Sequence, residues 1–287
     1  MTFAKNARVE YKLIVDGKWI TDPLNPNKID NGVGGENSFF TMPDYKPTEW
    51  DKNNNNPDKN QTIVSVQSLE TIEIDSKVYG EKRKIQVLGR MANEIRTTFY
   101  PVLYLQDGGE YINRANAVRI QQNLLKAGKI QPFLIVFLDP KDRMKEYWAN
   151  DDYAKFLAEE VVPVIDSKYN TIKNRDGRAV MGASLGGITA VNVALRYPQV
   201  FGRIGGQSSS FWIDNERIVK DLEKLDGQTK FKFYFDDGTL EGVEDSRKVV
   251  ETLKKKGFDV TYIEGETGHN WTAWRDRLAD ALMAIWK

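Results

Sequence analysis

The sequence carries Arg-Ala-Val-Met-Gly-Ala-Ser-Leu-Gly-Gly at residues 178–187, an apolar run of strand type that ends in Gly-x-Ser-x-Gly. A helical pattern follows at once. Strand, sharp turn and helix in this order predict a nucleophile elbow that holds Ser184 out at its tip. Gly182 and Gly186 suit such a strained turn because neither places a side chain beside the serine.

The helix expected behind Ser184 has a chemical use. Its first N–H groups lack intrahelical acceptors, so the N–H of Leu185 would face an atom on which negative charge develops. A chain that contains glycine can also carry Gly-x-Ser-x-Gly by chance. The strand before the motif and the helix after it favour the elbow.

Charge and cysteine content exclude several classes of function. The 287-residue chain has 41 basic and 41 acidic residues, so no overall field would attract nucleic acid or an anionic membrane. The absence of cysteine excludes disulfides, thiolate metal sites and a cysteine nucleophile. The first residues lack a hydrophobic signal core, and no apolar run reaches membrane-spanning length. We therefore expect a soluble, cytoplasmic protein, or a secreted one whose signal has been removed. The sequence leaves open whether the protein forms a homodimer.

The chain contains one histidine, His269. A metal site built on several histidines is therefore excluded, and we expect no metal. A single histidine is often a surface residue or a hydrogen-bonded structural one. If Ser184 needs a base near neutral pH, however, His269 is the only imidazole available.

Strands and helices alternate after residue 62. Antiparallel strands are expected over 62–75 and 83–89. The strands expected next are 101–106, 132–138, 178–182, 202–206, 231–235 and 259–263, and the helices are 114–127, 151–168, the one after Ser184, 214–224, 243–256 and 271–286. This pattern predicts an α/β-hydrolase fold, with a mostly parallel central sheet and helices on both faces. Ligands bind such sheets outside the carboxyl ends of the strands.

Composition divides the chain into three parts. Residues 1–42 read as a small β segment, 43–61 as a polar linker, and 62–287 as the α/β domain that carries Ser184. The linker assignment rests on four consecutive asparagines and three prolines.

Residues 1–42 resemble the C-terminal half of a glycogen-binding-type (E-set) β-sandwich. The resemblance rests on the hairpin 11–19, with its Asp16-Gly17 turn, and on Asn37-Ser38. It implies glycan binding with Trp19 as a sugar platform, although the front strands of that domain are missing here. Packing of Trp19 against the larger domain is the interpretation that we favour.

Candidate catalytic groups follow other strand ends. Gly108 and Gly109, after strand 101–106, would let backbone N–H groups face a ligand and complete an oxyanion hole, or they form an ordinary turn. His269 lies after strand 259–263.

An acid that orients the histidine is expected after strand 231–235. The four candidates are Asp236, Asp237, Glu241 and Glu244. Spacing alone favours Asp236 or Asp237, which lie nearest the strand end. With any of the four, the chain order is serine, acid, histidine, which is the order of α/β-hydrolases.

From about residue 62 onward the chain resembles the putative esterase family, which includes enterochelin esterases, feruloyl esterases and the mycolyl-transferring antigen 85 proteins. The matching stretches are 104–108, 182–187 and 268–275, and, for the enterochelin-esterase branch, 142–150, 159–163 and 206–212. The resemblance implies that Ser184 is the nucleophile, His269 the base and the N–H of Gly109 the second oxyanion donor. The family's acid lies in Gly-Thr-x-Asp/Glu, which residues 238–241 match, so the resemblance selects Glu241. The family has a bulkier residue at Gly109, but only the backbone is needed there.

The resemblance also implies a reaction. We expect a serine carboxylic-ester hydrolase that forms an acyl-enzyme on an aromatic, siderophore-type or feruloyl ester, without a cofactor. The alternatives are an acyltransferase or thioesterase of the same fold and, in a different class, a non-catalytic glycan-binding protein.

Flat or charged side chains are expected around the substrate. They are Arg143, Tyr147, Trp148, Trp212 and Trp271. Arg143 would face an anionic part of the substrate, or would form an ion pair with Glu146 or Glu160. Trp274 is expected to pack the last helix.

Overall fold

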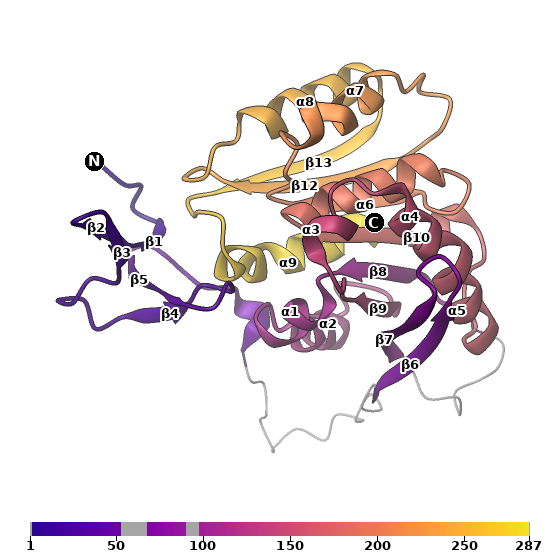
Figure 1. Cartoon of the computed structure of the whole chain (residues 1–287), viewed down its shortest axis with the longest axis horizontal. Helices are drawn as coiled ribbons and strands as arrows, with labels where there is room; N and C mark the ends of the chain where they lie inside the picture. Colours follow the sequence, from indigo (N-terminus) through magenta and orange to yellow (C-terminus); the bar gives the residue numbers. More distant parts are fainter. Residues whose placement is uncertain (1, 53–67, 90–97, 287) are drawn as a thin grey trace.

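The computed structural model describes residues 2–52, 68–89 and 98–286 (Figure 1). A central sheet of eight strands has the order β13-β12-β11-β10-β8-β9-β7-β6. Its strands are β6 (Ser68–Ser76), β7 (Glu81–Gly89), β8 (Val102–Gln106), β9 (Leu134–Leu138), β10 (Arg178–Ala183), β11 (Arg203–Gln207), β12 (Lys232–Gly238) and β13 (Asp259–Gly265). β8 to β13 are parallel, whereas β7 pairs antiparallel with both β6 and β9.

Helices cover both faces of this sheet (Figure 1). The α-helices are α1 (Gly108–Asn113), α2 (Ala117–Lys126), α3 (Arg143–Glu146), α4 (Asp151–Lys155), α5 (Val162–Lys168), α6 (Leu185–Arg196), α7 (Arg217–Glu223), α8 (Glu244–Lys255) and α9 (Trp271–Trp286). A π-helical turn, η2 (Phe156–Val161), joins α4 to α5, and short 3-10 turns lie at η1 (Glu49–Asp51), η3 (Arg175–Gly177) and η4 (Asp214–Glu216).

The core has two halves because successive strand side chains point to opposite faces. On β8, Val102 and Tyr104 join the half covered by α4 to α8, whereas Leu103 and Leu105 join the half covered by α1, α2 and α9. Strands buried on both faces explain the unbroken apolar runs in the sequence. The predicted α/β-hydrolase fold class is confirmed.

The helix predicted over 114–127 is α2, which begins at Ala117, and a separate short helix, α1, precedes it. Asn116 has φ +50 and precedes α2, so the backbone leaves the right-handed helical region there. Asp107, with φ +55, starts α1 directly at the end of β8. Gly109 therefore lies in the first turn of a helix.

The N-terminal part forms two small sheets of its own. β1 (Arg8–Tyr11), β5 (Glu36–Thr41) and β4 (Lys28–Asp30) make one, and β2 (Leu13–Val15) and β3 (Lys18–Ile20) make a hairpin. Trp19 on β3 is 68% exposed, so the packing of this side chain against the larger domain was wrongly predicted. The E-set resemblance stays a prediction.

The N-terminal sheets touch the large domain near α9. From β1, the N–H of Arg8 donates to the carbonyl of Glu266 at 3.0 Å. Just after the sheets, the hydroxyl of Tyr45 donates to Asp276 at 2.5 Å. Residues 43–52 of the predicted linker also touch it, since Asn123 on α2 donates to the carbonyl of Trp50 at 2.7 Å. The rest of that linker and residues 62–67 lie outside the described residues. Within the described ranges, no helix has the length and apolar character needed to cross a bilayer.

Candidate active site

Ser184 lies at a sharp turn between β10 and α6, with φ +56 and ψ −120. The turn brings the backbone of Gly182 and Gly186 together, so that a Cβ on Gly182 would lie 2.5 Å from Gly186 backbone atoms. A Cβ on Gly186 would lie 3.0 Å from a carboxylate oxygen of Asp107. The predicted Gly-x-Ser-x-Gly spacing is therefore a packing requirement of the turn.

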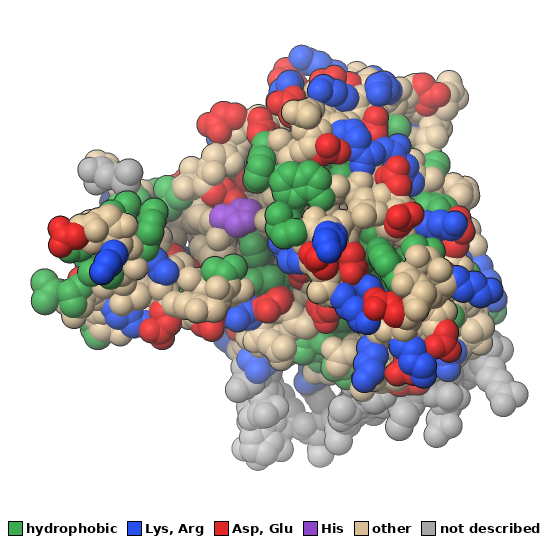
Figure 2. Space-filling model, in the orientation of Figure 1, with side chains coloured by type: hydrophobic (Ala, Val, Ile, Leu, Met, Phe, Trp, Pro, Cys, Tyr) green, Lys and Arg blue, Asp and Glu red, His purple; other side chains and the backbone are tan. Residues whose placement is uncertain are grey.

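His269 bridges the serine and an acid. Its Nε2 lies 2.9 Å from Ser184 Oγ, and its Nδ1 is hydrogen-bonded to Glu241 Oε2. Ser184 comes from the β10–α6 turn, Glu241 from the turn after β12, and His269 from the loop between β13 and α9. Figure 2 shows the imidazole at the surface, with hydrophobic side chains gathered beside it.

The carboxylate of Glu241 is held by several donors. Its Oε1 accepts the N–H of Gly238 at 2.6 Å and the hydroxyl of Ser208 at 2.7 Å. Burial would raise the pKa of Glu241, but the hydrogen bond and charge of His269, with the other two donors, lower it below its usual value. A carboxylate that stays ionised can only accept, so Nδ1 of His269 carries the proton and Nε2 faces Ser184 with its lone pair.

The other three acids do not contact His269. Asp236 is fully buried and pairs with Arg277 at 2.7 Å. Asp237 is buried on β12, and burial together with Asp236 raises its pKa to about 8. Glu244 begins α8 and is exposed. Spacing favoured Asp236 or Asp237, whereas the structure places Glu241 on the histidine.

The two residues expected to supply the oxyanion donors both lie in helix first turns. Leu185 is the first residue of α6, where N–H groups have no intrahelical acceptor. Gly109 is the second residue of α1, and its N–H donates to Oδ1 and Oδ2 of Asp139, at 2.9 and 3.1 Å.

Arg143 forms its ion pair with Asp107, and not with Glu146 or Glu160, the two ion-pair partners that the sequence allowed as an alternative to a substrate contact. Its Nε and Nη2 donate to the two carboxylate oxygens of Asp107 at 2.9 and 2.8 Å. Burial raises the pKa of Asp107, while Arg143 opposes that rise. Because Asp107 starts α1, this ion pair fixes the segment that carries Gly109.

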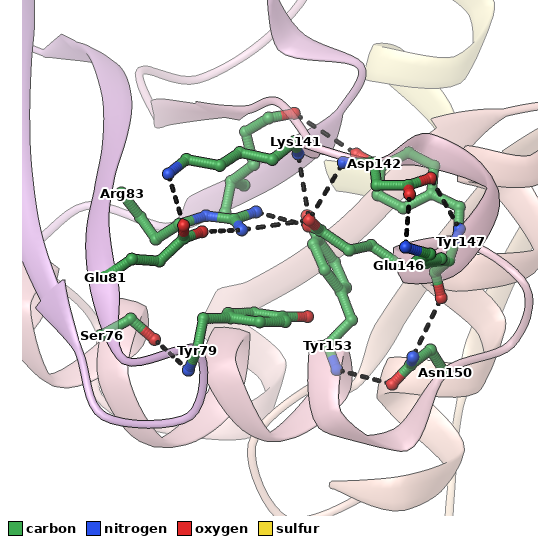
Figure 3. A network of polar contacts seen from close by, with 12 residues as sticks. Ser76, Tyr79, Glu81, Arg83, Lys141, Asp142, Glu146, Tyr147, Asn150 and Tyr153 are labelled. Atoms are coloured by element: carbon green, nitrogen blue, oxygen red, sulfur yellow. Dashed lines mark hydrogen bonds and ion pairs between the residues drawn. The ribbon is translucent and has the colours of Figure 1, made fainter.

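Glu146 instead forms the centre of a separate network (Figure 3). Arg83 from β7 donates to it through Nη1 at 3.0 Å and through Nη2. The same carboxylate accepts the N–H groups of Lys141 and Asp142, at 3.1 and 3.2 Å. The network anchors the segment that precedes α3, and thereby Arg143.

Tyr147 is fully buried, which contradicts its predicted contact with a substrate. Its hydroxyl accepts the N–H of Asp107 at 3.1 Å, and its ring packs edge-to-face against Tyr153. The sequence around Tyr147 does not show which way its side chain points.

The three tryptophans differ in exposure. Trp148 and Trp212 are 37% and 64% exposed and pack edge-to-face, with ring centroids 6.2 Å apart. Trp271 packs edge-to-face against Tyr111 and Trp274, at 5.2 and 4.7 Å, so most of its surface is taken by the protein. Trp274 is buried, as expected from the sequence.

Sequence reasoning gave no role to Ser208, although its stretch was among those carrying the family resemblance. Ser208 joins Glu241 to Trp274, whose indole N–H donates to Ser208 Oγ at 2.8 Å. The neighbouring Ser210 places its hydroxyl oxygen 3.4 Å from that of Ser184. A run of serines has no periodicity or charge that would reveal such contacts.

Comparison with known proteins places this chain in a family. Residues 76–285 match the model of the family described as Putative esterase. The endo-1,4-beta-xylanase/feruloyl esterase of Xylanibacter ruminicola is 32% identical over 200 residues, which cover 66% of this chain and 26% of that protein. The iron(III) enterobactin esterase of Escherichia coli O6:H1 is 24% identical over 284 residues, covering 93% of this chain and 68% of that protein.

Solved structures show the same fold. The enterobactin esterase of Shigella flexneri, solved in the presence of 2,3-di-hydroxy-N-benzoyl-serine, has a TM-score of 0.74 at 21% identity, covering 93% of this chain and 70% of that one. The ferulic acid esterase of Anaeromyces mucronatus, in complex with ferulic acid, has a TM-score of 0.61 at 19% identity, covering 79% of this chain and 94% of that one. Since the family model spans most of the sequence, the chain belongs to the putative esterase family.

Proposed function

We propose that the protein is a serine carboxylic-ester hydrolase, with Ser184 as nucleophile, His269 as base and Glu241 as the acid that orients the base. The observation that carries the proposal is the hydrogen bond between Ser184 Oγ and His269 Nε2, at 2.9 Å, with Glu241 behind the imidazole. A nucleophile, a base within hydrogen-bond reach and a group that orients the base are the parts that acyl transfer requires.

The reaction proceeds through an acyl-enzyme. Ser184 Oγ attacks the ester carbonyl while His269 Nε2 takes its proton, and the negative charge moves to the carbonyl oxygen. The C–O bond to the alcohol then breaks as His269 returns the proton to the leaving oxygen. Water, deprotonated by His269, attacks the acyl-enzyme and releases the acid and free Ser184.

The oxyanion would accept the N–H groups of Leu185 and Gly109. Both belong to helix first turns, so the helix dipoles add to their attraction for negative charge. Use of Gly109 requires that the Asp139 carboxylate leave this amide when an ester binds.

An aromatic acyl group is the substrate feature that the site favours. Trp148 and Trp212 offer exposed rings, and Ser210, two residues before Trp212, lies beside the nucleophile. Flat rings bind other flat rings through stacked or edge-to-face contacts. Feruloyl and dihydroxybenzoyl, which appear in the names of relatives and of a relative's ligand, are both aromatic acyl groups.

The same proposal sets the roles of the chain segments. Residues 62–287 form the domain that holds the catalytic groups. Residues 1–42 form a β segment that packs beside the loop carrying His269, and residues 43–61 link this segment to the catalytic domain. Support comes from the hydrogen bond between Arg8 and Glu266 and from Gly32, where an added Cβ would lie 3.0 Å from Trp271.

Hydrolysis of p-nitrophenyl acetate and of methyl ferulate tests the proposal. The wild-type protein should release p-nitrophenol and ferulic acid, and Ser184→Ala should lower kcat by roughly five to six orders of magnitude. An aryl fluorophosphonate should label the wild-type protein on Ser184 and leave Ser184→Ala unlabelled. Unchanged hydrolysis by Ser184→Ala would remove the proposed nucleophile.

A further inference from the structure

We propose that Ser208 is a positioning residue whose hydroxyl fixes the Glu241 carboxylate behind His269, an inference that rests on the proposed function. Ser208 follows β11 and is 3% exposed, so it is out of reach of a substrate. Its Oγ lies 2.7 Å from Glu241 Oε1 and 2.8 Å from Trp274 Nε1.

The chemistry of the three groups sets the direction of both hydrogen bonds. An indole N–H can only donate, so Ser208 Oγ accepts from Trp274. An ionised carboxylate can only accept, so the single hydroxyl proton of Ser208 goes to Glu241. Trp274 therefore holds the hydroxyl in the one rotation that serves the acid.

The result is a carboxylate with little freedom to rotate. Oε1 of Glu241 accepts two hydrogen bonds, one from Ser208 and one from the N–H of Gly238 at 2.6 Å. Oε2 is left for Nδ1–H of His269. Rotation of the carboxylate would break both bonds to Oε1, each of which involves a charged acceptor.

The same loop also holds the nucleophile. The N–H of Ser184 donates to the carbonyl of Gln207 at 2.8 Å, and the N–H of Ser210 donates to the carbonyl of Ser184 at 3.2 Å. Ser208 lies between these two attachments. One short loop thus positions both the serine and the acid, which are the two groups that His269 must reach at once.

The backbone of Ser208 supports a functional role. It has φ +48, a left-handed conformation that costs a non-glycine residue free energy. Glycine would adopt this conformation more easily. A serine in this position keeps the hydroxyl at the expense of backbone strain.

Ser208→Gly is the sharpest test because glycine suits this backbone and removes only the hydroxyl. We expect kcat for p-nitrophenyl acetate to fall about tenfold to a hundredfold, the effect of one hydrogen bond to a charged group, with KM within about twofold. Ser208→Ala should lower kcat by a similar factor. Ser209→Ala is the matched control, since the Ser209 hydroxyl is buried without a hydrogen-bond partner among the described residues, and its rate should stay within about twofold.

A double-mutant comparison separates positioning from general structural damage. In a Glu241→Ala background, Ser208→Gly should change kcat by less than about twofold, because its effect passes through the carboxylate. An equal loss in both backgrounds would overturn the inference, as would wild-type kcat in Ser208→Gly. A wild-type protein that neither hydrolyses aryl esters nor reacts with an aryl fluorophosphonate would contradict the proposed function itself, and the inference with it.

Discussion

The backbone N–H of Gly109 donates to both carboxylate oxygens of Asp139, at 2.9 and 3.1 Å. The same N–H is the proposed second donor to the oxyanion. The negative charge of the Asp139 carboxylate, hydrogen-bonded to this amide, opposes the development of another negative charge beside it. Asp139 also lies against the glycine itself, since a Cβ on Gly109 would be 3.1 Å from Asp139 Oδ2.

Asp139→Ala should therefore raise kcat for p-nitrophenyl acetate, by roughly fivefold, because it frees an N–H for the transition state. Steady-state kinetics at constant ionic strength would measure the change. Asp142→Ala is the control, since Asp142 is an exposed acid nearby whose side chain caps α3. A fall in kcat for Asp139→Ala would mean that the carboxylate helps to build the productive geometry.

Glu241→Ala should lower kcat by about four orders of magnitude, the size of effect seen for the acid of other triads. Asp237→Ala should cost far less, because Asp237 makes no contact with His269. Measuring both variants on the same ester gives the ranking directly. A larger loss from Asp237→Ala would reassign the acid.

The raised pKa of Asp237 also predicts that the stability of the protein depends on pH. Its folded pKa of about 8, raised by burial and by Asp236, exceeds the ordinary value of 3.8, so the folded state binds the proton more tightly than the unfolded state. The free energy of unfolding should fall as pH rises from about 4 to 8 on account of this group.

Asp237→Asn should remove that contribution. Its Tm should match the wild type near pH 4 and exceed it by a few degrees at pH 8, as followed by circular dichroism. Asp259→Asn, an exposed acid on the same sheet, serves as control. Parallel Tm curves for Asp237→Asn and the wild type would show that Asp237 is ionised throughout.

Trp212→Ala should raise KM for methyl ferulate about tenfold, because an exposed aromatic contact is lost. KM for p-nitrophenyl acetate should change by less than about twofold, since acetyl is too small to use the ring. Trp19→Ala removes another exposed indole, on the N-terminal hairpin, and should leave both KM values unchanged. Equal increases for both esters would assign Trp212 to the structure of the loop, and an increase for p-nitrophenyl acetate alone would place it against the leaving group.

The elbow and the parallel sheet could be predicted because their signals are local. A buried strand, a glycine-flanked serine and a helix follow one another without interruption, and the backbone has few other ways to accommodate them. The acid could not be selected from spacing. Side chains on β12 alternate between faces, so Asp236 meets Arg277 and Asp237 points toward Ser246, whereas Glu241 lies beyond the strand.

Contacts between distant segments could not be predicted from the sequence either. Asp107 and Arg143 are paired because β8 and β9 lie side by side, and residue types alone also allowed Glu146 or Glu160. Tyr147 was misplaced for the same reason, since a buried and an exposed tyrosine look alike in a sequence.

Left-handed backbone occurs at three positions in and around the catalytic groups: Asp107, Ser184 and Ser208, with φ of +55, +56 and +48. None is glycine, and such a conformation costs roughly 1–2 kcal/mol for an ordinary residue. Glycine at these positions would consequently raise thermal stability. Ser184→Gly, for example, would give a more stable protein without its catalytic nucleophile. Selection for thermal robustness alone would thus erode turnover unless these sites are held fixed.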